Sequence, residues 1–181
     1  YQTGIWYPFF RAHAHIDSRR HEPWVAGDPY TTIMREAVKL RYRLLPLFYT
    51  QFYKSSQTGE AIMTPLWYRD SSNELTYEID DQFYLGKLLV KPVQEENSVK
   101  TNIFLPNNKI YYDFFDFKII KGEDKYVELD SPLYKIPLLI EGNSITPMKS
   151  RYRRSTKLMK YDPYTLVIAL DENFKATGNL Y

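Results

Sequence analysis

The sequence predicts a mixed fold in which an α/β segment is followed by an all-β region. A helical pattern of apolar residues runs from residue 29 to about residue 55. Short apolar runs separated by turn residues recur through most of the remaining chain, as in an antiparallel β-sandwich. The character of the sequence changes between residues 64 and 76. A helix and a strand that lead into a sandwich fit the end of an α/β barrel joined to a β domain.

The helix is predicted from its start signal and its apolar face. Asp28 is expected to be the N-cap residue and Pro29 the first helical residue, where a missing N–H costs nothing. Pro46 is expected to kink the helix because it lacks an N–H and clashes with the preceding turn. Residues 55–59 end it. The apolar face consists of Ile33, Ala37, Leu40, Leu44 and Phe48.

The β region is predicted from short apolar runs. Residues 61–68 are expected to form a buried strand around Thr64-Pro65. We interpret the aromatic run Tyr111–Phe117 as a strand with a core face and a surface face, and a carbohydrate-binding platform is the alternative. Turn signals such as Pro106-Asn107-Asn108 separate the strands. Strands are predicted at residues 88–93, 99–105, 110–117, 125–129, 136–140, 144–146 and 165–170.

Composition excludes several classes of protein. Charged residues make up 25% and hydrophobic residues 44% of the chain, which is typical of a globular protein and not of a disordered one. The net charge of +2 is too small to indicate a nucleic-acid partner. No run of 18 apolar residues could span a membrane, and the absence of Cys rules out disulfides. Because the chain starts without Met and ends within a strand-like segment, we expect both ends to be truncated.

The densest group of polar and aromatic residues is Phe9–Asp17. His13, His15 and His21 lie within nine positions, and alternate residues of a strand could present two of them to a metal. Packing of the His residues inside a loop is a second interpretation. Recognition of a polar ligand is the third, because Arg11 and His13 offer directional donors beside aromatic walls.

Catalytic residues cannot be assigned from spacing. Ser18 does not form a nucleophilic set with Asp17 and His15, and the chain has no G-x-S-x-G turn. Glycoside hydrolysis needs two carboxylates that flank the bond. Asp17 and Glu22 lie in the loop, but each stands beside Arg or His and is more simply an ion-pair partner.

Four ordered motifs resemble glycoside hydrolase family 31. Gly4–His13 is similar to its F-x-P-F-x-R-x-H segment, and Arg41–Thr50 resembles its R-Y-x-L-L-P-Y-x-Y-T helix. Ile79–Val93 resembles the stretch I-D-x-Q-F-x-x-G-x-x-L-L-V-x-P-V. Leu166–Asp171 resembles a strand of the distal β domain. The family usually has Arg before the Pro of its M-R-P-L segment, whereas this chain has Thr64 before Pro65.

The resemblance implies a domain organisation. Residues 1–66 would be the end of a (β/α)₈ TIM barrel, residues 67–146 a proximal β-sandwich, and residues 147–181 the start of a distal β domain. The resemblance also implies a retaining α-glucosidase without metal or cofactor. Its two catalytic Asp residues would lie outside this chain, so the chain alone is expected to be inactive. His13 would contact a glucose hydroxyl, and Arg11 is a second substrate-binding candidate that we expect to organise the loop.

Phe9–Asp17, with Arg20 and Glu22-Pro23-Trp24, resembles the members of the family that trim glucose from N-linked glycans. This implies a glucosylated N-glycan or α-glucoside substrate, a separate non-catalytic β subunit and a location in the lumen of the endoplasmic reticulum. No nucleic-acid partner and no membrane span are expected. A non-catalytic carbohydrate-binding or interaction module and an inactive homologue are the alternatives.

Overall fold

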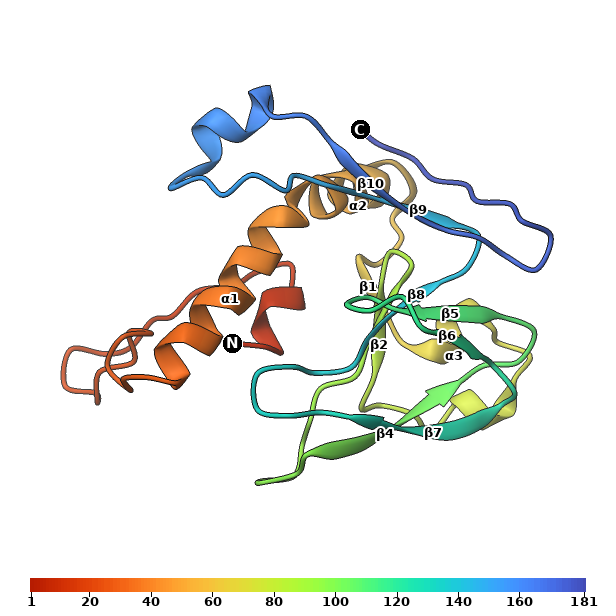
Figure 1. The fold of residues 1–181 in the computed structure, drawn as a ribbon, viewed down its shortest axis with the longest axis horizontal. Coiled ribbons are helices and arrows are strands. Elements are labelled where there is room, and N and C mark those ends of the chain that lie inside the picture. The colour runs from red at the N-terminus through yellow and green to blue at the C-terminus, as the bar shows by residue number, and fades with distance from the viewer.

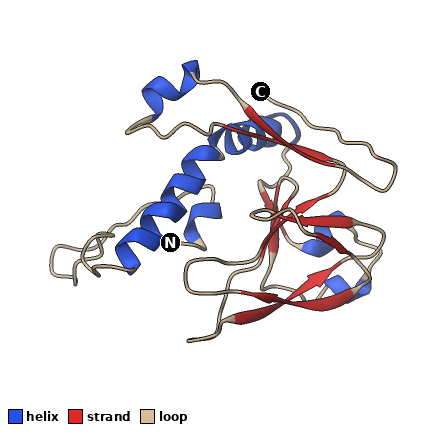
Figure 2. Cartoon of the chain, viewed as in Figure 1, coloured by secondary structure: helices blue, strands red, loops and turns tan.

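The computed structural model describes residues 1–181, and its elements form layers around one central sheet (Figure 1). Two helices, α1 (Tyr30–Arg43) and α2 (Leu45–Thr58), lie against one face of this sheet. A two-stranded sheet of β4 (Lys100–Leu105) and β7 (Lys125–Asp130) covers the other face. Every strand pair is antiparallel, which confirms the predicted antiparallel β region. The long helices α1 and α2 both lie in the N-terminal third of the chain, and Figure 2 shows the remaining helical segments as short turns.

The helical prediction is confirmed in its main features and corrected at its ends. α1 begins at Tyr30, so Pro29 is the cap residue instead of the first helical residue. The Asp28 carboxylate nevertheless accepts a hydrogen bond from the Thr32 backbone N–H at 3.3 Å. The helix breaks at Leu44, and Pro46 follows as the second residue of α2, where its missing N–H needs no intrahelical partner.

α2 continues three residues past the predicted end. It ends at Thr58, and Gly59 then takes a φ of 74°, a left-handed conformation that suits a residue without Cβ. The N–H of Gly59 donates to the Ser55 carbonyl at 2.8 Å, which satisfies one of the last helical carbonyls. Polar residues at 55–58 therefore extend the helix because the glycine, and not the change in polarity, terminates it.

The central sheet has six strands in the order β1-β2-β3-β8-β5-β6. Its short strands sit close to most of the predicted runs, but β2 and β6 were not predicted. The six strands are β1 (Met63–Thr64), β2 (Phe83–Leu85), β3 (Leu88–Val90), β5 (Ile110–Asp113), β6 (Ile119–Lys121) and β8 (Leu138–Glu141).

Alternation along the central strands divides the core into two parts. In β3, Leu88 and Val90 point to the helical side, whereas Leu89 points to β4 and β7. β8 follows the same rule, with Leu138 and Ile140 on the helical side and Leu139 opposite. Apart from Glu141 at the end of β8, both strands are apolar on both faces because both faces are covered. This explains why their sequences read as continuous apolar runs without alternation.

The prediction of one buried strand over residues 61–68 is wrong. Only Met63 and Thr64 form β1, and residues Leu66–Arg69 form a short helix, α3. Pro65 separates the two elements because it has no N–H to donate to a strand ladder. Only Leu66 is buried in α3, while the side chains of Trp67 and Tyr68 are exposed. A run of apolar letters was therefore mistaken for a buried strand.

The C-terminal part forms a separate hairpin above α2 (Figure 1). β9 (Ser144–Met148) pairs with β10 (Thr165–Ala169), and the connection between the two strands contains the 3-10 helix η3 (Thr156–Tyr161). Strand β9 crosses the predicted domain limit at residue 146. Strand β1 lies before the predicted limit at residue 66, yet it pairs with the central sheet. The domain limits at residues 66 and 146 remain predictions. None of the helices combines the length and the apolar character that crossing a lipid bilayer requires.

Candidate functional site

The segment that carries Arg11 and His13 is a loop between the 3-10 helix η1 (Gly4–Trp6) and α1. Figure 1 shows this loop beside the N-terminal part of α1, away from the layers of strands. Ile5 and Trp6 are buried in the helical side of the core, so the loop starts from a fixed point. All residues from 11 to 21 are exposed.

The base of the loop is held by Arg41, which lies near the end of α1. Its guanidinium donates hydrogen bonds to the carbonyls of Ile5 at 2.5 Å, Tyr7 at 2.7 Å and Pro8 at 3.2 Å. From the sequence, Arg41 was identified only as part of a helix motif. The sequence did indicate that Arg41 faces the core, since Arg41 stands four residues after Ala37 and therefore on the apolar face of the helix.

His13 lines an open hollow of about 320 Å³ that the loop forms around itself. The structure brings His15 and His21 to the same hollow, together with Arg19 and Arg20. The hollow is polar and its His and Arg side chains offer hydrogen-bond donors, which suits a ligand rich in hydroxyl groups. The structure thus groups the three His residues that the sequence singled out.

Arg11 does not line this hollow. Its guanidinium carbon lies 5.5 Å from the centre of the Phe9 ring, a cation–π distance, and Phe9 is 74% exposed. We expected Arg11 to organise the loop, but the hydrogen bonds that gather the base of the loop come from Arg41.

The three His residues line one hollow, but no three or more His, Asp or Glu side chains are arranged so that they could hold a metal ion. The His15 Nδ1 instead accepts a hydrogen bond from the Asp17 backbone N–H at 3.2 Å and lies 3.4 Å from the Asp17 carboxylate. These contacts are local and exposed. They support neither a metal site nor packing of the His residues inside the loop.

The Glu22 carboxylate of the loop is not suited to proton donation. Hydrogen bonding to its own backbone and to Arg20 holds the pKa of Glu22 below its usual range. A general acid needs a raised pKa instead. The Arg20 Nη2 stands 3.2 Å from the Glu22 carboxylate, so this pair is an ion pair as the sequence indicated.

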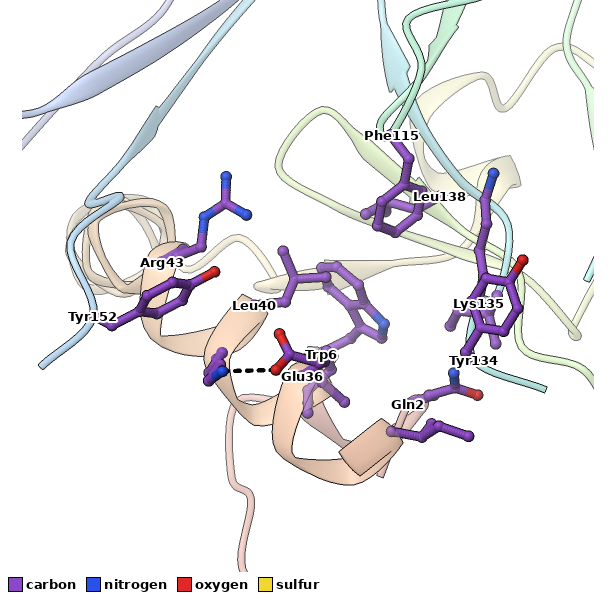
Figure 3. Close-up of a pocket in the computed structure, with 15 residues that line it drawn as sticks. Gln2, Trp6, Glu36, Leu40, Arg43, Phe115, Tyr134, Lys135, Leu138 and Tyr152 are labelled. Carbon is purple, nitrogen blue, oxygen red and sulfur yellow. Dashed lines mark hydrogen bonds and ion pairs between the residues drawn. The ribbon is translucent and has the colours of Figure 1, made fainter. Parts of the chain in front are cut away.

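A second cavity, of about 160 Å³, lies between η1, α1 and the segment before β8 (Figure 3). Trp6, Leu40 and Leu138 form its apolar wall, and Glu36 pairs with Lys39 at 2.6 Å on its helical side. The indole N–H of Trp6 is buried and has no hydrogen-bond partner. This cavity is built from the junction of helices and sheet and does not include His13.

The aromatic run Tyr111–Phe117 is only partly a strand, because β5 ends at Asp113. Tyr111 and Phe114 are buried in opposite core clusters, whereas Phe115 and Phe117 are exposed. Phe117 has a φ of 60° in the turn that follows. The core-and-surface interpretation is therefore confirmed for residues 111–113, and a turn replaces the predicted strand after them.

Models of known families match two adjacent stretches of the chain. Residues 1–51 match the model described as "Glycosyl hydrolases family 31 TIM-barrel domain". Residues 59–146 match the model described as "Glycosyl hydrolase family 31 C-terminal domain". The predicted fold class, a barrel end followed by an antiparallel β domain, agrees with these matches.

Individual relatives cover the whole chain. It is 48% identical over 186 residues to "Glucosidase 2 subunit alpha" of Saccharomyces cerevisiae, a match over 100% of this chain and 19% of that protein. A crystal structure of a glucosidase II alpha subunit with alpha3-Glc2 bound superposes with a TM-score of 0.95 at 48% identity, covering 99% of this chain and 20% of the other.

A third similar structure is the ER glucosidase II heterodimer of a catalytic subunit and the binding domain of a regulatory subunit. Its TM-score is 0.95 at 48% identity, with 99% of this chain and 20% of the other covered. This chain thus spans about one fifth of the length of the relatives that it matches. Because the two family matches are adjacent and the similarity to these relatives extends from end to end, the chain belongs to glycosyl hydrolase family 31.

Proposed function

We propose that this chain is the C-terminal part of a retaining α-glucosidase that removes terminal α-linked glucose during N-glycan trimming. The observation that carries the proposal is the end-to-end similarity to an alpha subunit crystallised with alpha3-Glc2. In a retaining mechanism, one carboxylate attacks the anomeric carbon and a second protonates the leaving oxygen. Both carboxylates would come from the four fifths of such a protein that lie outside this chain.

His13 supplies the contribution of this chain to the site. Its ring is exposed in the polar hollow and can donate to a sugar hydroxyl. Such a bond accelerates the reaction where it becomes stronger in the transition state than in the bound substrate. Arg11 is the weaker candidate for substrate contact, because it lies beside Phe9 and outside the hollow.

The domain organisation and surroundings of the protein belong to the same proposal. Residues 1–66 would complete the (β/α)₈ barrel, residues 67–146 form the proximal sandwich and residues 147–181 begin the distal β domain. A non-catalytic β subunit would be the protein partner, supported by the heterodimeric relative described above. The same relative is an ER enzyme, which supports a location in the lumen of the endoplasmic reticulum.

A direct test uses the longer protein that contains this chain and nigerose, the α-1,3-linked glucose disaccharide. Proton NMR follows the released glucose, and retention requires that the α-anomer appears before mutarotation produces the β-anomer. Maltose and isomaltose serve as linkage controls. Release of the β-anomer first would contradict a retaining mechanism, and absence of hydrolysis of all three sugars would contradict the glucosidase assignment.

A further inference from the structure

Arg41 is a partly buried cation whose hydrogen-bond acceptors are all backbone carbonyls. It contacts the carbonyls of Ile5, Tyr7 and Pro8, which lie 33 to 36 positions earlier in the chain. No ion pair of the structure includes Arg41. Burial lowers the pKa of Arg41, as desolvation does for a cation. The carbonyl dipoles therefore provide the charge compensation that a carboxylate would normally give.

Two aromatic rings complete the surroundings of this guanidinium. Its central carbon lies 4.3 Å from the centre of the Phe48 ring in α2 and 5.4 Å from the centre of the Phe10 ring in the loop. Both distances are within the range of cation–π attraction. Arg41 therefore joins three elements, since it is part of α1, it contacts α2 through Phe48 and it binds the start of the loop.

The geometry suits Arg and not Lys. A guanidinium is planar and presents five N–H donors in a fixed fork, so that one side chain can reach three carbonyls and still stack on rings. An ammonium is a compact charge on a flexible stem and would keep only part of this arrangement. The three bonds span residues 5–8, and the cation–π contact extends the anchored stretch to Phe10.

Beyond Phe10, the loop makes few contacts that could place its side chains. Residues 11–21 are exposed, and their ion pairs are the local ones of His15 with Asp17 and of Arg20 with Glu22. The position of His13 is therefore set mainly by the anchored residues that precede it. We propose that Arg41 is a positioning residue for the sugar-contacting segment, acting through the backbone of residues 5–8 on His13; this inference rests on the proposed function.

The test measures kcat/KM for nigerose with the longer α-glucosidase that contains this chain. Arg41→Lys is expected to lower kcat/KM by about 100-fold, the order of loss that a displacement of about 1 Å can cause. Arg35→Lys is the matched control on the same helix, because Arg35 is exposed and has no ion pair, and it is expected to keep the wild-type kcat/KM. Phe10→Leu removes one ring and keeps the carbonyl bonds, so a smaller loss is expected.

A double-mutant cycle with His13→Ala separates positioning from general damage to the fold. If Arg41 acts through His13, Arg41→Lys should cost little once His13 is already Ala, whereas independent effects would multiply. Wild-type kcat/KM in both Arg41→Lys and Phe10→Leu, or losses that multiply with that of His13→Ala, would overturn the positioning role. If Arg41→Lys does not fold, Phe10→Leu decides by the same cycle. A wild-type enzyme without glucosidase activity would instead contradict the proposed function.

Discussion

Gln82 and Phe104 form a reciprocal pair of hydrogen bonds in the interior of the β region. The Gln82 Nε2 donates to the Phe104 carbonyl at 2.8 Å, and the Phe104 backbone N–H donates to the Gln82 Oε1 at 2.8 Å. Gln82 is 1% exposed, and Phe104 lies in β4. The Gln82 side chain thus makes the pair of hydrogen bonds that a neighbouring strand would make. It links the residue before β2 to the sheet of β4 and β7.

Replacing Gln82 by Leu is expected to destabilise the 181-residue chain by roughly 2–6 kcal/mol. The substitution leaves a buried N–H and a buried carbonyl without partners, and each such group costs about 1–3 kcal/mol. Urea unfolding followed by circular dichroism measures the loss. Gln94→Leu is the control, because Gln94 is exposed. An unchanged unfolding midpoint for Gln82→Leu would show that the two bonds do not stabilise the fold.

Lys91 and Asp81, the residue before Gln82, form a partly buried ion pair. The Lys91 side chain is 5% exposed and that of Asp81 28% exposed. Lys91→Met should destabilise the chain by about 3–5 kcal/mol, since it leaves a desolvated carboxylate without its partner. The double variant Lys91→Met with Asp81→Leu should recover much of this loss. Equal unfolding midpoints for the single and the double variant would contradict this account.

Glu141 makes the stability of the β region dependent on pH. Burial raises the pKa of Glu141, but the ammonium groups of Lys109 and Lys87 outweigh burial and hold this pKa below its usual range. Since the folded-state pKa is depressed, the stabilisation is present above the unfolded-state pKa of about 4.3 and is lost as pH falls through the folded-state pKa.

Urea unfolding of wild type and Glu141→Gln at pH 7 and at successive steps below pH 4.3 tests this dependence. The free-energy difference between the two proteins should be largest at pH 7 and shrink as the solution becomes more acidic. A difference that is constant across this range would show that Glu141 does not contribute through its charge.

His13→Ala in the longer enzyme is expected to remove roughly 2–4 kcal/mol of transition-state stabilisation, as the loss of other active-site donors does. This corresponds to a decrease of about 30- to 900-fold in kcat/KM. His13→Gln keeps a hydrogen-bond donor at the position and should lose less. An α-glucosidase with His13→Ala and wild-type kcat/KM would exclude the role of His13 in sugar contact.

The 181-residue chain by itself is expected to release no glucose from a chromogenic α-glucoside, because a glycosidase needs two carboxylates around the scissile bond. The carboxylates of its polar loop are held in local ion pairs, since Glu22 pairs with Arg20 and Asp17 lies 3.4 Å from His15. Hydrolysis measured against a buffer blank and against the longer enzyme tests this expectation. Activity of the chain alone at a rate comparable with the longer enzyme would refute it.

Local sequence signals predicted most elements of the fold. The spacing of Ala37, Leu44 and Phe48 identified the buried face of the helices, and all three are buried. Pro46 marked the helix break because a missing N–H acts locally. The error at residues 61–68 had the opposite origin, since an apolar run does not state whether its residues are buried. Trp67 and Tyr68 are exposed in a helix that follows Pro65.

The sequence by itself determined the family, the antiparallel β region and the polar loop with His13, because these follow from ordered motifs, turn residues and local periodicity. Only the tertiary structure decided how that loop is held. Arg41 reaches the carbonyls of Ile5, Tyr7 and Pro8 across more than 30 positions, and Gln82 reaches Phe104 across 22. Backbone carbonyls carry no residue identity, so contacts to them leave no pattern in the sequence and become visible only when the chain is folded.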